Sequence, residues 1–248
     1  MNTQVSMIET LRTADRLAMT ALLDRCFEGV SEAVFAADLQ DKTHAVLMHD
    51  TRGRLVGFST LAIWPTEGPT GQPATIVCSG DTIVAPEAWG SWALPRQWIR
   101  AVYDLHQSIG RGELYWLLIC SGFRTFRFLP VFVQRFVIAA EPPASSADEA
   151  EDLTSCWRWM NRLAEQRWAH RFDSALGIVR LDHPQRLRSG LSDIPSGRAE
   201  QPDVKRFVHL NPGHQRGDEL VCLASLARDN LTPAGRRMLA APVRSAGN

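Results

Sequence analysis

The chain has 248 residues, of which 45% are hydrophobic and 22% are charged. These values are ordinary for a globular protein and supply enough apolar side chains for a sizeable core. Lysine plus arginine equals aspartate plus glutamate at 27 each, so no global field draws the chain to nucleic acid or to an anionic membrane. No run approaches about 18 apolar residues, and the opening MNTQVSMIETLRTADR lacks the apolar segment of a signal peptide. We therefore expect a cytoplasmic protein with no nucleic-acid or membrane partner.

The cysteines and histidines form no metal-binding or redox motif. The five cysteines are Cys26, Cys78, Cys120, Cys156 and Cys222. No two of them are close enough for a CxxC element, and the seven histidines show neither HxxH nor HExxH spacing. We therefore expect reduced thiols and no metal.

Two helices and a hairpin are predicted in the first 64 residues. Apolar residues at roughly helical spacing predict a helix over 8–27, and a shorter helix follows over 31–40 with Ser31 as its N-cap. The period then changes, because HAVLMHD (44–50) and LVGFSTLAIW (55–64) have the pattern of two strands around the polar turn TRGR. The chain therefore begins with a pair of helices and continues into a β-hairpin.

A glycine flanked by tryptophans joins the next strand to the next helix. TIVCSGDTIVAPE (75–87) has strand character, and Gly80 interrupts it in a way that is typical of a β-bulge. The helix that follows contains Pro95, which is tolerated only in the first helical turn. The helix therefore begins near Ser91 to Ala93, directly after Gly90.

The second half of the chain alternates strands and helices around one break in composition. ELYWLLICS (113–121) is a near-continuous apolar run, which is typical of a strand covered on both faces. FRTFRFLPVFVQRFV (123–137) predicts a helical or mixed segment, AAEPPASSADEAED (139–152) an exposed connection, and 153–172 a helix. The last residues, 241–248, are expected to be loose. Later strands are predicted over 174–181, 204–210 and 219–226.

The order of these elements resembles that of the GNAT acyltransferase superfamily. The best local match is TIVAPEAWGSWALPRQWIRAVYDL, in which residues 84–86 fit the end of the family's fourth strand and Gly90 fits the first glycine of its phosphate-binding turn. The resemblance implies an α/β fold with a mixed, mostly antiparallel central sheet flanked by helices. It covers a core of about residues 1–138, followed by a helical insertion, and strands within 173–240 would complete the sheet.

The resemblance also implies that this turn holds the phosphates of a thioester donor. Backbone N–H groups from Gly90 to Leu94 would bind the anion with the help of the helix dipole. Two residues depart from the family pattern, because Glu87 stands where a basic or amide residue is expected and Trp92 where a second small residue belongs. The implied donor is acyl-CoA or acyl-ACP. The carrier protein has a single phosphate and no adenosine diphosphate, so it requires fewer contacts from this turn than CoA does. The implied donor-binding residues are Ile83, Val84, Ala85, Gly90, Ser91, Trp92, Ala93, Leu94 and Arg124.

Acyl transfer to an amine requires a base and a proton for the leaving thiolate. Asp81, next to the bulge at Gly80, is the candidate base, directly or through water; alternatively its carboxylate stabilises its own irregular backbone. Ser121 is a candidate to hydrogen-bond the pantetheine arm or to protonate the thiolate, or else it is a cap. The tyrosine acid common in the family has no counterpart, since the chain has only Tyr103 and Tyr115.

Two further groups of polar residues are candidates for substrate binding. HLNPGHQRGDELVCL contains two turn signals before a strand, and His214 with Asp218 and Glu219 would form an acceptor-binding cluster in which an acid tunes the pKa of His214. The alternative is a polar hairpin tip. Arg124 and Arg127 share a helical face that would hold a phosphate or a carboxylate, or would simply be solvated.

Three functions remain open on the sequence alone. The first is an acyltransferase that moves an acyl group from a CoA or acyl-carrier-protein thioester to a small amine. The second is a catalytically silent GNAT-like protein that binds a ligand or partner, which the departures at Glu87 and Trp92 and the missing tyrosine favour. The third is a homodimer formed through a tryptophan-rich insertion. The tryptophans of that insertion, Trp157, Trp159 and Trp168, fit an acyl channel or an ordinary core equally well.

Overall fold

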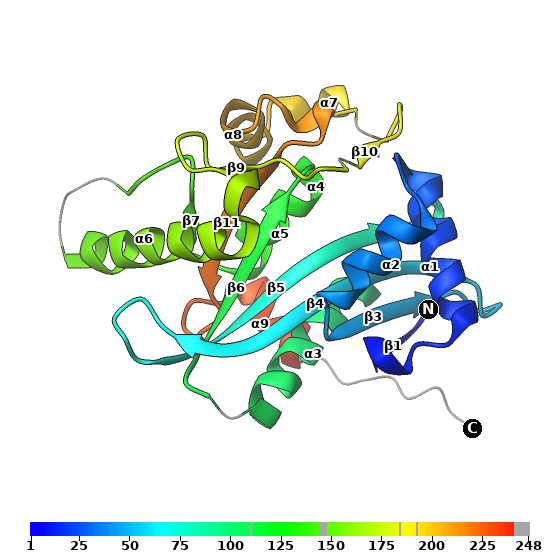
Figure 1. Ribbon diagram of the computed structural model, residues 1–248, viewed down its shortest axis with the longest axis horizontal. Helices are drawn as coiled ribbons and strands as arrows, with labels where there is room; N and C mark the ends of the chain where they lie inside the picture. Colours follow the sequence, from blue (N-terminus) through cyan, green and yellow to red (C-terminus); the bar gives the residue numbers. More distant parts are fainter. Residues whose placement is uncertain (110, 144–147, 184, 192, 241–248) are drawn as a thin grey trace.

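The computed structural model describes residues 1–109, 111–143, 148–183, 185–191 and 193–240 (Figure 1). The strands are β1 (Asn2–Met7), β2 (Phe27–Glu28), β3 (His44–His49), β4 (Leu55–Glu67), β5 (Pro73–Val84), β6 (Glu113–Cys120), β7 (Val137–Ile138), β8 (Phe172–Asp173), β9 (Ile178–Val179), β10 (Arg186–Leu187) and β11 (Glu219–Ser225). The α-helices are α1 (Thr13–Cys26), α2 (Glu32–Gln40), α3 (Ala93–Ile109), α4 (Phe123–Phe126), α5 (Phe128–Phe132), α6 (Asp148–Trp168), α7 (Ser196–Ala199), α8 (Pro202–Leu210) and α9 (Pro233–Ala240). Short 3-10 turns are η1 (Ile8–Thr10), η2 (Pro86–Ala88), η3 (Ala169–Arg171) and η4 (His214–Arg216).

One mixed sheet organises the molecule. Its strand order is β1-β3-β4-β5-β6-β11-β9-β8, with β7 also paired to β11. Every neighbouring pair in this sheet is antiparallel except β5 and β6, which are parallel. Strands β2 and β10 form a separate two-stranded ribbon. The predicted fold class, a mostly antiparallel mixed sheet with helices around it, is confirmed.

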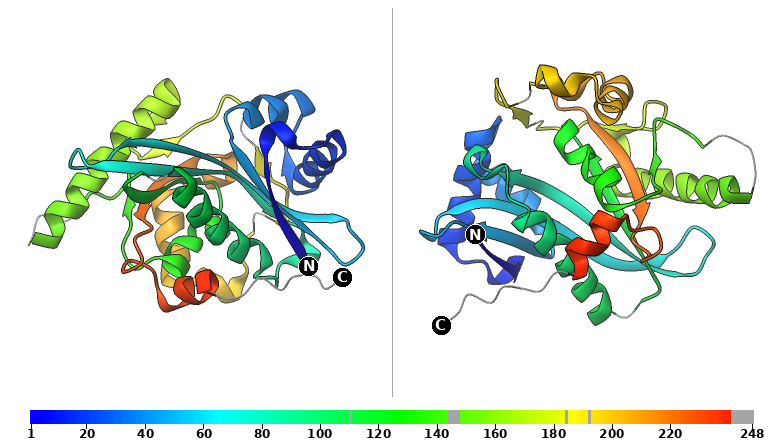
Figure 2. Two further views of the ribbon diagram at one scale, coloured as in Figure 1. Left: turned by 90° about the horizontal axis from the view of Figure 1, so that it is seen from below. Right: turned by 180° about the vertical axis from the view of Figure 1, so that it is seen from behind.

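Helices cover both faces of this sheet. Helices α1, α2 and α6 lie on the face turned to the viewer in Figure 1, and α3, α5 and α9 lie on the opposite face (Figures 1 and 2). Short helices α7 and α8 lie near the end of the sheet at which β5 and β6 finish, and α8 packs against α4 (Figure 1). The end of β5 is thus surrounded by helices from both halves of the chain.

Two apolar clusters hold the helices against the two faces of the sheet. The larger cluster joins α1, α2 and α3 to strands β3, β4 and β6 and includes fully buried Phe35, Phe58 and Ile99. The second cluster lies beneath α6, whose residues 159–168 place two tryptophans and three smaller apolar side chains against β6 and β11. Burial of apolar area of this kind is the main stabilising contribution in a domain of this size.

Several sequence predictions are confirmed in detail. The hairpin of β3 and β4 is present, and Ser31 caps α2 by accepting a hydrogen bond from the Val34 N–H at 3.2 Å. Helix α3 begins at Ala93, shortly after Gly90, with Pro95 in its first turn. The strand predicted from the apolar run ELYWLLIC is β6, and it pairs on both sides.

The structure differs from the prediction at several places, most of them in the second half of the chain. The segment predicted as a strand over 204–210 lies in helix α8, because Val204 and Phe207, three positions apart, are buried on one helical face. The strand predicted over 174–181 is reduced to β9. Strand β1 and helix α9 have no counterpart in the prediction. Helix α6 begins at Asp148, inside the predicted connection 139–152.

Parts of two predictions cannot be placed. Residues 144–147 of the predicted connection and the predicted loose tail, 241–248, lie outside the described residues. The proposed division into a core over 1–138, an insertion over 153–172 and later strands over 173–240 remains a prediction, although β8, β9 and β11 do join the first sheet.

Across the described ranges, none of the helices combines the length and apolar character that crossing a membrane requires.

Candidate active site

The parallel strands β5 and β6 separate at their carboxyl ends. Their pairing stops where Ser79 lies opposite Leu118. Beyond that point β5 continues beside β4 as far as Val84, while β6 continues beside β11 as far as Cys120. Each of the two strands therefore ends with one edge that pairs with no other strand of the described chain. Between these edges the sheet has a V-shaped opening.

A β-bulge lies at the start of this opening. The register of β4 and β5 shifts so that Thr60 of β4 faces two residues of β5, Gly80 and Asp81. Any larger residue at position 80 would force its neighbours to move, because a Cβ there would overlap the side-chain atoms Lys42 Cε and Thr60 Oγ1. The predicted bulge at Gly80 is confirmed.

The edge of β5 beyond the bulge presents backbone groups to the opening. The Ala85 N–H donates to the Val56 carbonyl of β4 at 2.8 Å. Because successive residues of a strand point their backbone groups to opposite sides, Ile83 also faces β4, whereas Thr82 and Val84 face the opening. Of the three strand residues predicted to bind the donor, only Val84 therefore offers its N–H to a ligand in the opening. The N–H groups of Ile83 and Ala85 serve the sheet.

The turn after β5 leads into α3 with unused N–H donors. The N–H groups of Gly90, Trp92 and Leu94 have no hydrogen-bond partner within the described part of the chain. Those of Ser91 and Ala93 are already bound inside the turn, to the Ala88 carbonyl at 2.9 Å and to the Ser91 hydroxyl at 3.2 Å. Three of the five N–H groups predicted to bind an anion thus remain available, at the positive end of the helix dipole.

The approach to this turn is open. A Cβ at Gly90 would meet no atom within 4 Å, and its φ is not in the left-handed region. The flanking indoles of Trp89 and Trp92 are 45% and 49% exposed, so neither fills the turn. Trp89 Nε1 donates to the Val84 carbonyl oxygen at 2.8 Å and so occupies one acceptor at the edge of β5.

A guanidinium group lies beside the turn. Arg124 of α4 stacks its guanidinium 4.4 Å from the ring centroid of Trp89 and donates to the Leu191 carbonyl at 2.6 Å. Burial, with the charge of Arg198 in second place, lowers the pKa of Arg124 below its ordinary value. The predicted phosphate-binding arginine, three positions after Ser121 in the chain, thus contacts Trp89 of the turn. By contrast, Arg127 forms an ion pair with Asp203 at 2.7 Å.

Glu87 does not point an unpaired charge at the turn. Its carboxylate forms an ion pair with Arg25 at 3.1 Å. A hydrogen bond from its own backbone N–H, followed by the bond from Arg25, lowers the pKa of Glu87. The departure from the family pattern at this position is therefore offset by a cation from α1.

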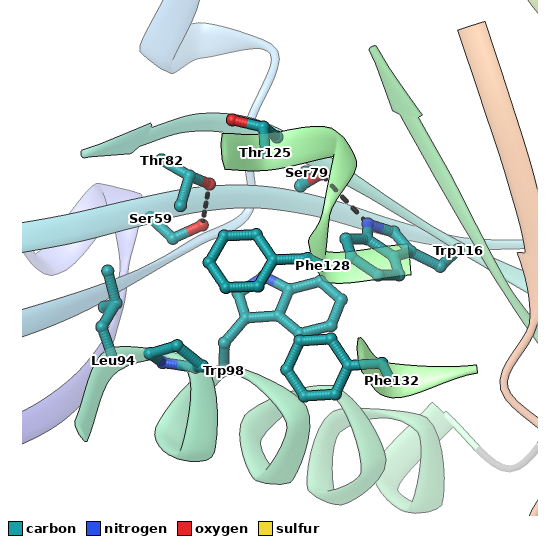
Figure 3. Close-up of a pocket in the computed structure, with 10 residues that line it drawn as sticks. Ser59, Ser79, Thr82, Leu94, Trp98, Trp116, Thr125, Phe128 and Phe132 are labelled. Carbon is teal, nitrogen blue, oxygen red and sulfur yellow. Dashed lines mark hydrogen bonds between the residues drawn. The ribbon is translucent and has the colours of Figure 1, made fainter. Parts of the chain in front are cut away.

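An aromatic cavity lies on the α3 side of the opening (Figure 3). Its volume is about 20 Å³, which holds about one water molecule. Trp98 and Trp116 pack at 4.6 Å between ring centroids, and Phe128 and Phe132 lie beside them. The lining residues are Ser59, Ser79, Thr82, Leu94, Pro95, Trp98, Trp116, Thr125, Phe128 and Phe132.

Two hydrogen-bonded pairs form the polar wall of this cavity. Ser79 Oγ accepts a hydrogen bond from Trp116 Nε1 at 3.1 Å, and the hydroxyls of Ser59 and Thr82 are 2.8 Å apart (Figure 3). Since Ser79 and Thr82 flank the bulge, the cavity reaches the point at which β5 and β6 separate. Its small volume restricts what can enter without movement of the phenylalanines.

Carboxylates gather around the other side of the bulge. Burial, followed by the charge of Asp38, raises the pKa of Asp81 to about 7, and Lys42 opposes this shift. Burial, followed by the charges of Asp81 and Asp38, raises the pKa of Glu219 to about 8. Lys42 Nζ donates to Asp38 Oδ1 at 2.7 Å. Asp38 of α2, Asp81 of β5 and Glu219 of β11 thus form one acidic group, and Lys42 is a cation within it.

The group predicted around His214 is divided among different partners. Asp218 forms an ion pair with Arg180 at 3.4 Å, whereas Glu219 lies within the electrostatic reach of Asp81. His214 packs on Phe207, with 5.4 Å between ring centroids. Burial lowers the pKa of His214, whereas a neighbouring acid would have raised it.

Ser121 follows β6 at the opening. It is partly exposed and makes no side-chain hydrogen bond to another described residue. A role in contacting the donor or the leaving thiolate therefore remains a prediction.

Neither tyrosine reaches the opening through its hydroxyl. Tyr103 donates to the Leu226 carbonyl and Tyr115 donates to Glu113 Oε2. Cys120 ends β6, but burial, followed by its hydrogen bond with Cys222, raises the pKa of its thiol well above the ordinary value. These observations disfavour both a tyrosine acid and a thiolate nucleophile here.

The tryptophans of the inserted helix belong to the core of this chain. Trp159 and Trp168 are buried beneath α6, and Trp157 Nε1 donates to the Ile138 carbonyl at 3.1 Å. They are therefore not available for the dimer interface on which the self-association hypothesis rests, and dimerisation itself remains a prediction. Among the described residues, no group of three or more His, Cys, Asp or Glu side chains is arranged to hold a metal ion.

Asp38 and Lys42 are not among the residues predicted from the sequence, and Glu219 is predicted in a different cluster, with His214 and Asp218. Asp38 and Lys42 are four positions apart at the end of a helix, a spacing that usually marks a solvated ion pair. The one available signal was the glycine at position 80, since a mid-strand glycine often marks a site where another group approaches closely. Here the approaching group is the side chain of Lys42.

Several solved structures are similar to part of this chain. No family model and no curated protein sequence matches it. An acetyltransferase from Trypanosoma brucei is 21% identical, with a TM-score of 0.37 over 51% of this chain and 88% of that one. A GNAT family N-acetyltransferase from Escherichia coli, solved in complex with CoA, is 21% identical, with a TM-score of 0.36 over 51% of this chain and 67% of that one.

A third solved structure extends slightly further along the chain. An acyl-CoA N-acyltransferase from Pseudomonas aeruginosa is 17% identical, with a TM-score of 0.38 over 56% of this chain and 90% of that one. The chain is thus similar to each of these proteins over about half of its length, at low identity. What its own site can bind and catalyse depends on the geometry described above.

Proposed function

We propose that the protein is an acyltransferase that moves an acyl group from a CoA or acyl-carrier-protein thioester to an amine acceptor. The observation that carries this proposal is the opening between β5 and β6, which has a bulge at its start and leads to a helix with three unused N–H groups. A fork of this kind brings a thioester on one face of a sheet within reach of an amine on the other. We also propose, from the sequence, that the protein is cytoplasmic.

The donor would lie along the free edge of β5. An extended pantetheine arm has amide groups that can pair with the Val84 N–H, as an added strand would. Its phosphates would bind the N–H groups of Gly90, Trp92 and Leu94, with Arg124 beside them. This places the thioester next to Ser79 and the bulge.

The acceptor would approach from the side of Asp81 and Glu219. Two carboxylates there favour a cationic amine, and a base with a pKa of about 7 can accept a proton from it near neutral pH. The amine nitrogen then forms a bond to the thioester carbonyl carbon. The carbon–sulfur bond breaks, and the thiolate leaves with a proton. Ser121 remains the candidate donor of that proton.

A second candidate function is that of a binding protein without turnover. The specific observation in its favour is the small volume of the aromatic cavity, about 20 Å³, together with the indole of Trp89 on the Val84 carbonyl. An acyl donor would have to displace that indole and shift Phe128. If neither moves, the opening can bind a phosphate-bearing ligand at the turn but cannot hold a thioester at the bulge.

Thiol release separates the two functions. The protein is incubated with acetyl-CoA, longer acyl-CoAs or acyl-ACP and a panel of primary amines, and free thiol is measured with time. Acyl transfer predicts release that depends on both substrates and falls about 100-fold in Asp81→Asn, the usual size of a general-base contribution. A thermal shift with CoA but no release with any amine would support the binding protein. No shift and no release would reject both.

A further inference from the structure

A lysine side chain occupies the acceptor side of the bulge. Lys42 follows α2, and its side chain is only 6% exposed. A Cβ at Gly80 would overlap Lys42 Cε and would lie 3.4 Å from Lys42 Nζ. Lysine is seldom buried to this extent, and one in contact with a candidate active site is a candidate for chemistry.

Two polar atoms near this lysine lack partners. Thr60 Oγ1 and Asp81 Oδ2 are buried and make no hydrogen bond within the described part of the chain. Thr60 is fully buried on β4, and its hydroxyl lies beside the same face of Gly80 that Lys42 covers. Buried polar groups without partners are rare, and at a site they mark a place that a substrate group or water fills.

The charged groups around Lys42 come from three elements. Asp38 of α2 accepts from Nζ through Oδ1 at 2.7 Å and through its carbonyl at 3.2 Å. Asp81 of β5 and Glu219 of β11 lie within its electrostatic reach. Asp38 is thus the carboxylate that contacts the amine, and the charges of Asp81 and Glu219 act on it from a longer distance.

We propose that Lys42 is an internal acyl acceptor, so that the protein acylates its own Lys42 when a thioester is bound and no external amine is present. This inference rests on the proposed acyltransferase function of the same site. Lys42 loses a proton to Asp81 or Asp38, and its nitrogen forms an amide bond to the thioester carbonyl carbon. The carbon–sulfur bond breaks, and the thiolate takes up a proton. The products are an acyl-lysine and free CoA or pantetheine thiol.

The modification would change the electrostatics of the site. An acylated Lys42 is neutral, so Asp38 loses its ion-pair partner and the acidic group around the bulge loses its cation. The acyl group would also lie where an external amine must approach. Self-acylation therefore reduces turnover in proportion to its extent.

The chain carries its own control for this experiment. It contains two lysines, Lys42 and Lys205. The side chain of Lys205 is 57% exposed and forms an ion pair with Glu200. Spontaneous chemical acylation favours the exposed amine, whereas acylation at the site favours the buried one.

The experiment uses the full chain and acetyl-CoA, with acetyl-pantetheine as a second donor, in the absence of amines. Intact-mass spectrometry follows the addition, and peptide mapping assigns it to Lys42, Lys205 or the amino terminus. We expect one acetyl group on Lys42, formed at least about 10-fold faster than on Lys205 and slowed in Asp81→Asn. Mapping of the wild-type protein needs no variant, so misfolding of Lys42→Arg cannot obscure the result.

Two outcomes overturn the inference and leave the proposed function intact, and a third rejects both. Release of thiol with an external amine, without acetyl on Lys42, rejects self-acylation alone. Acetylation of Lys205 as fast as Lys42 shows chemical acylation only and also rejects it. If neither an external amine nor Lys42 accepts the acyl group, the acyltransferase function and the inference fail together.

Discussion

The indole Nε1 of Trp89 donates a hydrogen bond of 2.8 Å to the carbonyl oxygen of Val84. This bond spans five residues and joins the turn before α3 to the free edge of β5. It matters because the same carbonyl is the last acceptor on that edge before the turn. A donor whose pantetheine arm pairs with β5 therefore competes with the protein's own indole.

Replacing Trp89 with phenylalanine should raise donor affinity. Phenylalanine keeps a ring for Arg124 to stack on but removes the Nε1–H, which leaves the Val84 carbonyl free. A hydrogen bond of about 1 kcal/mol predicts a Kd about 5-fold lower for acetyl-CoA, measured by calorimetry. Trp92→Phe is the control, because the Trp92 indole is equally exposed and has no hydrogen bond to the described residues. Equal affinities for both variants would show that the donor does not use this carbonyl.

Gly90→Ala should weaken donor binding without loss of stability. The new methyl group meets no protein atom, and the backbone at Gly90 does not require a positive φ. It does reduce the space in which phosphate oxygens approach the N–H groups of the turn, and a cost of about 1.4 kcal/mol raises the KM for the donor about 10-fold. Gly197→Ala, also in open space, is the matched control. An unchanged KM in Gly90→Ala would place the phosphates elsewhere.

The sequence was informative wherever local patterning decides structure. The hairpin, the strand β6 and the start of α3 follow from hydrophobic period, turn residues and the position of Pro95. The bulge followed from Gly80 alone. Helix α8 was mistaken for a strand because VKRFVHL satisfies both periods, although Pro202 before it is a helix-start signal.

The acidic group of Asp38, Asp81 and Glu219 was harder to predict from the sequence because it depends on tertiary structure. Glu219 lies far from Asp81 along the chain, and they come together only because β11 returns beside β6. Lys42 carries no local sign of burial, since its ion pair with Asp38 has the spacing of a surface pair. Sequence reasoning therefore identified the base candidate but not the residues that set its pKa.

Activity should rise with pH through the ionisation of Asp81. Its pKa of about 7 means that the base is largely protonated at mildly acidic pH and ionised above neutrality. With an acceptor whose amine is unprotonated throughout the range, kcat/KM should rise about 10-fold per pH unit below that pKa and level off above it. The rise should disappear in Asp81→Asn. If it persists with the same midpoint, another group is the base.

Stability should change with pH in the opposite direction. The folded-state pKa values of Asp81 and Glu219, about 7 and about 8, exceed the ordinary 3.8 and 4.5, so the folded protein binds more protons than the unfolded chain between these limits. The free energy of unfolding therefore falls as pH rises from about 5 to about 8. Calorimetry should show a Tm that is lower at the higher pH by at least several degrees, since each kcal/mol corresponds to about 2–4 °C.

The double variant Asp81→Asn/Glu219→Gln tests the source of this pH dependence. Neutral amides of similar shape remove both titrations, so the fall in Tm with rising pH should disappear over the same range. The ion-paired Asp50, whose pKa is lowered by a backbone hydrogen bond from Arg54, titrates below this range and does not contribute. A Tm that still falls by the wild-type amount would mean that these two carboxylates are not the buried titrating pair.

Phe128→Ala should extend the range of acyl groups that the protein accepts. In the wild type the aromatic cavity beside the bulge has a volume of about 20 Å³, so a chain longer than acetyl requires a larger displacement of Phe128 than acetyl does. Phe128 lines this cavity and stacks on Phe132 at 5.9 Å between centroids, and its removal opens space at the point where the acyl group would lie. Each methylene buried in that space contributes about 0.8 kcal/mol, or about 4-fold in kcat/KM.

The measurement is the ratio of kcat/KM for butyryl-CoA to that for acetyl-CoA. Two extra methylenes predict a rise of about 15-fold in this ratio for Phe128→Ala. Phe136→Ala is the matched control, because Phe136 is also half-buried and packs on Phe126, away from the cavity. Both variants lose apolar contacts, so a general loss of stability would affect them alike. A ratio that stays constant in Phe128→Ala would show that the acyl chain does not enter this cavity, and the donor position deduced from the opening between β5 and β6 would have to be abandoned.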